Sequence, residues 1–133
     1  IGIENSARLY LSDSLRLKAA YTYSEAEEDG GVEALRVPRS VASIGANWTG
    51  LDGALGLNLD ALFISSQYGD GGSRAAGAKL AGYEVVNLAA TYRVTELNSI
   101  WLRLGNVLDA EYEEISGYQT AGATVHAGVR VNF

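Results

Sequence analysis

The sequence predicts an all-β protein, specifically an antiparallel transmembrane β-barrel segment of about seven strands. Stretches of about ten residues, in which apolar and polar side chains alternate, recur along the chain, and they match membrane-spanning strands in length and pattern. Tight turns and long loops alternate between the stretches. The tight turns lie at roughly 12–14, 50–53 and 95–98, and the long loops at roughly 27–39, 68–82 and 109–122. Tight turns at one end of the strands and long loops at the other are typical of outer-membrane barrels.

The first four predicted strands follow this pattern with increasing clarity. The first, about 2–11, is the weakest, because Asn5 shares a face with Ile3, Ala7 and Leu9. The next three strands place these apolar residues on one face: Leu15, Leu17, Ala19, Tyr21 and Tyr23; Ala42, Ile44, Ala46 and Trp48; and Leu55, Leu57, Leu59, Ala61 and Phe63. Alternate residues of a strand point to opposite sides of its sheet, so each strand has one apolar and one polar face.

The last three predicted strands repeat the arrangement. Their apolar faces carry Val86, Leu88, Ala90, Tyr92 and Val94; Ile100, Leu102 and Leu104; and Val125, Ala127, Val129, Val131 and Phe133. The opposite faces carry Arg, Lys, Asn, Asp and small residues. Burying such a polar face in the core of a soluble sandwich would be costly, whereas it suits a wet or plugged barrel lumen.

Aromatic residues lie near both ends of the apolar face. If the tight turns are periplasmic, Trp48, Tyr92 and Phe133 lie near that side, and Tyr21, Tyr23 and Phe63 lie near the other. Two aromatic belts around an aliphatic band are typical of a surface that faces lipid. The aromatic placement therefore favours a membrane barrel over a soluble β-sandwich, which would show the same alternation.

Composition limits the classes of function. The chain has 133 residues, enough for one domain, and its formal net charge of −6 with a single His argues against nucleic-acid binding. Without Cys, neither a disulfide framework nor a thiolate metal site can form. No apolar run approaches the roughly 18 residues of a membrane-spanning helix. The first residue is Ile and no secretory signal is present, so we expect a piece of a longer protein.

An odd number of strands supports the same expectation. Bacterial barrels usually have an even number of strands, about eight or more. Unpaired N–H and C=O groups at an open edge are unfavourable in lipid. We therefore expect residues 1–133 to be the C-terminal part of a larger barrel.

Several segments resemble one known family. NVLDAEYE at 106–113 resembles the N-L-F/L-D-x-x-Y segment near the end of TonB-dependent outer-membrane receptors. GYQTAG at 117–122 is similar to their G-Y-x-x-x-G-R stretch before the last strand, although Ala123 replaces the usual Arg. Tyr83 with VVNL at 85–88 resembles their Y-x-x-v-N/D-l strand, and RVPR at 36–39 resembles the x-P-R that opens a strand. Within the family, YQTAG at 118–122 is most similar to the vitamin B12 (cobalamin) transporter branch.

The resemblance implies a location, partners and a function. Family barrels have about 22 strands and lie in the bacterial outer membrane, and they enclose an N-terminal plug domain, which is absent here. A small-molecule ligand, either cobalamin or a ferric siderophore, would bind at the outer loops, and the TonB energy-transducing complex would drive uptake through the plug. The resemblance implies no cofactor, metal or nucleic acid, and no enzymatic activity. The other partners would be membrane lipid, the rest of the barrel and the barrel assembly machinery, which recognises a terminal signal similar to Val129, Val131 and Phe133.

Two sets of residues are candidates for binding. Tyr112, Tyr118 and Gln119 lie in the last long loop, where aromatic and amide groups suit contact with a bulky ligand, although loop packing explains them equally well. On the polar face, Arg16, Lys18, Arg93, Arg103 and Arg130 could pair with acidic plug residues, or could simply be solvated in the lumen.

Other candidate sites are weaker. The acidic run Glu25, Glu27, Glu28 and Asp29 and the two Asp-Gly-Gly segments at 29–31 and 70–72 could bind Ca²⁺, but their spacing fits ordinary loops and turns better. His126 lies on the polar face, with no nucleophile or metal-ligand motif around it.

Three other classes of protein remain open at this stage. One is a small self-standing outer-membrane barrel with a structural or adhesion role. The second is a barrel enzyme that uses His126, and the third is a soluble β-sandwich binding module.

Overall fold

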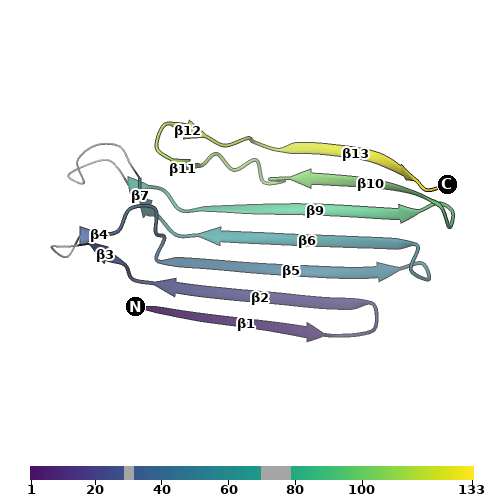
Figure 1. Ribbon diagram of the computed structural model, residues 1–133, viewed down its shortest axis with the longest axis horizontal. Coiled ribbons are helices and arrows are strands. Elements are labelled where there is room, and N and C mark those ends of the chain that lie inside the picture. Colours follow the sequence, from purple (N-terminus) through teal and green to yellow (C-terminus); the bar gives the residue numbers. More distant parts are fainter. Residues whose placement is uncertain (29–31, 70–78) are drawn as a thin grey trace.

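The computed structural model describes residues 1–28, 32–69 and 79–133. Its main feature is a single antiparallel sheet of seven strands in the order β1-β2-β5-β6-β9-β10-β13. Figure 1 shows these strands lying side by side. Their bounds are Gly2–Tyr10 (β1), Leu15–Ser24 (β2), Ser40–Gly50 (β5), Leu55–Ile64 (β6), Tyr83–Arg93 (β9), Asn98–Gly105 (β10) and Thr124–Val131 (β13). Each long strand therefore pairs with the next one along the chain, as the sequence predicted.

The long loops contain short hairpins, all at the same end of the sheet (Figure 1). We call residues 25–39, 65–82 and 106–123 the first, middle and last loops. Their paired segments are β3 (Glu27–Glu28) with β4 (Val32–Glu33), β7 (Gln67–Tyr68) with β8 (Lys79–Leu80), and β11 (Glu113–Ile115) with β12 (Tyr118–Gln119). The sequence did not predict these hairpins, because two or three residues are too few to show an alternating pattern.

The tight turns at the opposite end are fixed by local chemistry. In the second turn Leu51, Asp52 and Gly53 all have positive φ (52°, 51° and 81°), a geometry that suits a short connection between twisted strands. In the third turn the Thr95 hydroxyl oxygen accepts hydrogen bonds from the backbone N–H groups of Leu97 (3.3 Å) and Asn98 (3.0 Å). These contacts explain why the turns need so few residues.

The strand register places the apolar residues in rows across one face. One row runs Trp48, Leu57, Ala90 and Leu102, and the next runs Ala46, Leu59, Leu88 and Leu104. Among the described residues only Val85 is a buried hydrophobic residue. Large apolar side chains therefore remain exposed on one face of the seven-stranded sheet, and no second sheet formed by the described residues covers them as the sandwich alternative requires.

The opposite face carries polar contacts between neighbouring strands. Lys18, Gly45 and Asp60 lie in one row across β2, β5 and β6, and Lys18 Nζ forms an ion pair with Asp60 Oδ1 at 2.7 Å. The Lys18 side chain crosses above Gly45, where a Cβ atom would lie 2.0 Å from Lys18 Cε. Both charged side chains are about half exposed, so we expect the pair to contribute no more than about 1 kcal/mol to stability.

The predicted lumen-facing arginines, Arg16, Arg93, Arg103 and Arg130, form no ion pair with any described residue. Arg93 and Arg130 flank Ser99 in one row, and Arg103 pairs in register with His126. The Arg103 guanidinium lies 5.5 Å from the centre of the Trp101 ring.

Within the described part of the chain, no helix is long and apolar enough to cross a membrane.

Candidate ligand site at the long-loop end

Backbone and side-chain contacts connect the three long loops. The Arg36 N–H of the first loop donates to the Tyr68 carbonyl of the middle loop at 2.8 Å. The Gln67 amide of the middle loop donates to the Glu114 carbonyl of the last loop at 3.4 Å. Hydrogen bonds thus link the described parts of the three loops to one another at this end of the sheet.

Asn106 organises the base of the last loop. It is only 5% exposed and has a φ of 48°, which Asn adopts more readily than most residues. Its side-chain nitrogen donates to the carbonyls of Ala110 (2.9 Å) and Ala121 (3.3 Å), and its side-chain oxygen accepts from the Ala110 N–H (3.0 Å). The buried Asn106 side chain therefore links the two sides of the last loop at its base.

Asp109 and Tyr112 add further contacts between the two sides of the loop. The Asp109 carboxylate accepts a hydrogen bond from the Ala123 N–H at 2.7 Å. The Tyr112 carbonyl accepts hydrogen bonds from the N–H and the hydroxyl of Thr120, at 3.1 and 2.9 Å. These hydrogen bonds hold the two sides of the last loop together.

Two of the sequence motifs meet in space. The Asn87 side-chain oxygen on β9 accepts a hydrogen bond from the Asn106 N–H at 3.0 Å. Four residues earlier on β9, the Tyr83 ring stacks on Tyr112, with ring centres 4.0 Å apart and 17° between the ring planes. The Y-x-x-v-N segment of β9 therefore holds the N-L-F/L-D-x-x-Y segment of the last loop at two points.

A pocket of about 380 Å³ lies between the middle and last loops. Residues 79–82 form one side, and Glu111, Tyr112, Glu113 and Gln119 form the other. Basic, acidic, amide and phenol residues thus line a space next to apolar Leu80, a mixture that suits an organic ligand with scattered polar groups. We call this space the rim pocket.

The structure brings together two of the three predicted ligand residues. Tyr112 and Gln119 both line the rim pocket, whereas Tyr118 does not and is 73% exposed. The sequence analysis missed Lys79, which comes from the preceding long loop. No local pattern marks Lys79, because only the packing of two loops places it beside Tyr112.

The acidic segments that could bind Ca²⁺, which the sequence assigns to ordinary loops and turns instead, are described only in part. Glu25 and Glu27 are exposed, and Asp29 and the Asp-Gly-Gly segments at 29–31 and 70–72 lie outside the described residues. Within the described ranges, no group of three acidic or His side chains could hold a metal ion.

A family model described as "TonB dependent receptor-like, beta-barrel" matches residues 2–109. The chain belongs to this family. Members are β-barrel proteins of the outer membrane of Gram-negative bacteria, which confirms the predicted fold and location. The family resemblance found in the sequence is confirmed as well, but the comparisons give no specific support to its cobalamin branch.

Curated relatives and solved structures agree with the TonB-dependent family. The chain is 32% identical over 123 residues to the ferrichrome outer membrane transporter/phage receptor of Escherichia coli (strain K12), covering 84% of this chain and 16% of the relative. It is 31% identical over 125 residues to the ferrioxamine B receptor of Salmonella typhimurium (strain SL1344), with coverages of 84% and 17%. The structure of P. aeruginosa FpvA bound to a pyoverdine superposes with a TM-score of 0.84 at 20% identity, over 99% of this chain and 19% of that one. The relatives are transporters and receptors, and the chain spans about a sixth of the length of the two curated ones.

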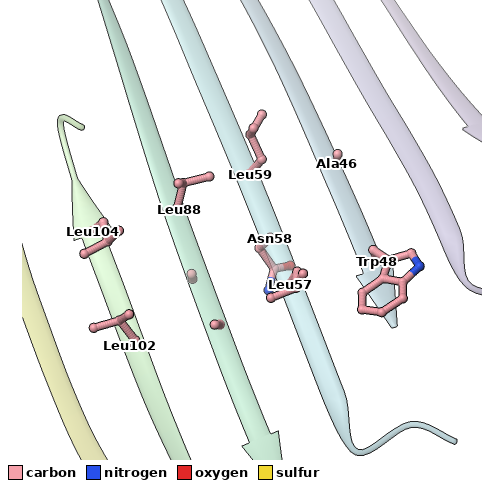
Figure 2. A pocket seen from close by; sticks show the side chains of 10 residues that line it. Ala46, Trp48, Leu57, Asn58, Leu59, Leu88, Leu102 and Leu104 are labelled. Atoms are coloured by element: carbon pink, nitrogen blue, oxygen red, sulfur yellow. The ribbon is translucent and has the colours of Figure 1, made fainter. Parts of the chain in front are cut away.

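Within a TonB-dependent barrel, the apolar face is the surface in contact with lipid. A second pocket, of about 390 Å³, lies on this face. Figure 2 shows it between Trp48 on β5 and Leu102 and Leu104 on β10. Leu57, Leu59 and Leu88 stand between them on β6 and β9. Since its lining is almost wholly aliphatic and aromatic, we assign this space to lipid chains and not to a polar ligand.

The predicted assembly residues lie along the edge strand. Val129 and Val131 are exposed on β13, and Phe133 follows the strand, which ends at Val131 and not at the last residue. The Asn132 N–H still donates to the Leu97 carbonyl at 3.0 Å, so the sheet pairing continues one residue further. Because the Val129 and Val131 side chains are exposed, the apolar face of this segment is accessible.

Proposed function

We propose that this chain is the C-terminal wall of a TonB-dependent receptor that takes up a ferric siderophore. The proposal depends chiefly on the rim pocket, where Tyr112 and Gln119 meet Lys79 at the long-loop end of the sheet. Long loops of outer-membrane barrels face the outside of the cell, so the pocket is placed to meet an external ligand. The ferrichrome and ferrioxamine B receptors among the relatives favour a siderophore as that ligand.

The chain contributes a ligand pocket and a lipid-facing surface to this function, and no covalent chemistry. The rim pocket holds part of the ligand, and the apolar face anchors the wall in lipid. Energy from the TonB complex would act through the plug domain, which residues 1–133 do not include.

The polar face is the proposed contact with the plug. Lys18 already pairs with Asp60 on the wall itself, so the stronger candidates for pairing with acidic plug residues are Arg16, Arg93, Arg103 and Arg130. Arg binds carboxylates with two parallel hydrogen bonds and is the usual residue for such contacts.

Cobalamin is the alternative ligand. It is favoured only by the likeness of YQTAG at 118–122 to the cobalamin branch, and Tyr118 lies outside the rim pocket.

Uptake by the intact receptor tests the proposal. The full reading frame containing this chain is expressed in a strain without its own siderophore and cobalamin receptors. Radioactive iron bound to ferrichrome or ferrioxamine B, and radioactive cobalamin, are then supplied separately. We expect iron uptake that depends on TonB, and no cobalamin uptake. Cobalamin uptake alone, or iron uptake that persists without TonB, would contradict the proposal.

Deletion of Phe133 tests its proposed role in assembly. We expect the intact receptor without this residue to reach the outer membrane at a much lower level, because the assembly machinery would lose the aromatic group of its proposed signal. Quantitative immunoblots of outer-membrane fractions measure the effect, with Phe133→Tyr as the control that keeps an aromatic ring. Normal assembly of the deletion variant would disprove the role.

A further inference from the structure

Tyr83 contacts the rim pocket only through another residue. It does not line the pocket, but its ring stacks on Tyr112, which does, at 4.0 Å between ring centres. Its hydroxyl group donates a hydrogen bond to Glu114 Oε1 at 3.3 Å. Tyr83 therefore contacts the last loop on both sides of Glu113, another residue that lines the pocket.

The two partners of the stack differ in how they are supported. Tyr83 is the first residue of β9 and pairs with Ile64 of β6, so the sheet fixes its backbone. Tyr112 lies in the last loop, outside any strand, and its backbone is held through Thr120 and, at the base of the loop, through Asn106. The Tyr83 ring is thus a fixed surface of the barrel wall against which a loop side chain rests.

We infer that Tyr83 is a positioning residue for ligand binding, because it holds the Tyr112 ring in place as a wall of the rim pocket. The inference rests on the proposed function. Its ligand class is a ferric hydroxamate siderophore, whose oxygens can accept hydrogen bonds from the donor-bearing lining residues Lys79, Tyr112 and Gln119. Glu111 and Glu113 line the same pocket, so an anionic ligand is disfavoured. A contact residue that is already ordered loses less conformational freedom on binding, so the complex is tighter.

A double-mutant cycle on the purified intact receptor tests the inference, with ferrichrome as the probe and Kd measured by calorimetry. Tyr83→Leu and Tyr112→Leu should each weaken binding by about two- to tenfold, the range that a stacked aromatic pair supplies. The double variant should bind no more weakly than the weaker single variant, because either change removes the same stack. Tyr83→Phe should bind like the wild type, since it keeps the stack and loses only the long hydrogen bond to Glu114.

Controls separate positioning from general stability. Tyr10→Leu changes an exposed tyrosine at the tight-turn end, on β1, and should leave Kd unchanged. A purely structural role of Tyr83 would lower the thermal midpoint of the barrel without coupling to Tyr112 in Kd. Additive losses, or normal binding by Tyr83→Leu when Tyr112→Leu binds weakly, would overturn the inference.

Failure of the inference can be distinguished from failure of the proposed function. If the wild-type receptor binds ferrichrome and Tyr112→Leu binds it equally well, the rim pocket is not the ligand site. The inference then fails, while siderophore uptake stands on the binding and uptake measurements and no longer on the pocket. If the wild-type receptor binds neither ferrichrome nor ferrioxamine B, the proposed function fails with it.

Discussion

Replacing Leu59 with Arg should destabilise the barrel in lipid by about 2–4 kcal/mol, the typical cost of a cationic side chain at the middle of a lipid-facing strand. Leu59 is the fifth residue of the ten in β6, and its row partners Ala46 and Leu88 lie on the same apolar face. A guanidinium at this position would lose its water and find no carboxylate nearby. Unfolding of the intact receptor in lipid vesicles by urea or guanidinium measures the change.

Asn58→Arg is the matched control, since Asn58 is the preceding residue and points to the polar face. There it forms a hydrogen bond with Asn47, and an added Arg could reach water in the lumen. We expect this variant to lose less than about 1 kcal/mol, as for most solvent-accessible substitutions. Equal losses for the two variants would contradict the assignment of one face to lipid. A larger loss for Asn58→Arg would show that the two faces have been assigned the wrong way round.

The seven long strands could be predicted from the sequence because each has enough alternating positions to define its faces. Leu55 to Phe63, for example, supplies five apolar residues at a spacing of two. The paired segments β7 and β8 could not be predicted, because Gln67–Tyr68 and Lys79–Leu80 are two residues each. Their pairing depends on the geometry of the strands that bring them together.

The candidate site was predictable only in part, for a related reason. Tyr112 and Gln119 could be selected as loop residues of suitable chemistry, but Lys79 enters the pocket from a different loop. The likeness of 83–88 and 106–113 to family motifs identified the segments without showing that they touch. Only the structure shows Tyr83 stacked on Tyr112, and Asn87 bound to the Asn106 backbone.

Asn106→Ala should release the last loop from the sheet and lower the free energy of local unfolding by about 3 kcal/mol. The substitution removes the side-chain hydrogen bonds to Ala110 and Ala121 at a position that is 5% exposed, and the partly buried backbone groups of the loop base lose these partners. It also places Ala at a φ of 48°, which adds about 1 kcal/mol of backbone strain. Since about 1.4 kcal/mol corresponds to a factor of ten in an equilibrium constant, a protease that cuts only the open loop should cleave roughly 100-fold faster.

Two further substitutions at Asn106 separate the causes of this effect. Asn106→Gly removes the same hydrogen bonds but adopts positive φ without strain, so it should be cleaved less rapidly than Asn106→Ala, though still much faster than the wild type. Asn98→Ala is the control, because it lies at the other end of β10 and its side-chain oxygen has no hydrogen-bond partner in the structure. Mass spectrometry of the fragments from intact receptor in detergent should place the new cuts between residues 106 and 123. If Asn106→Gly were as resistant as the wild type, the side-chain hydrogen bonds would be dispensable, and the role of Asn106 would be only to adopt positive φ at the base of the loop.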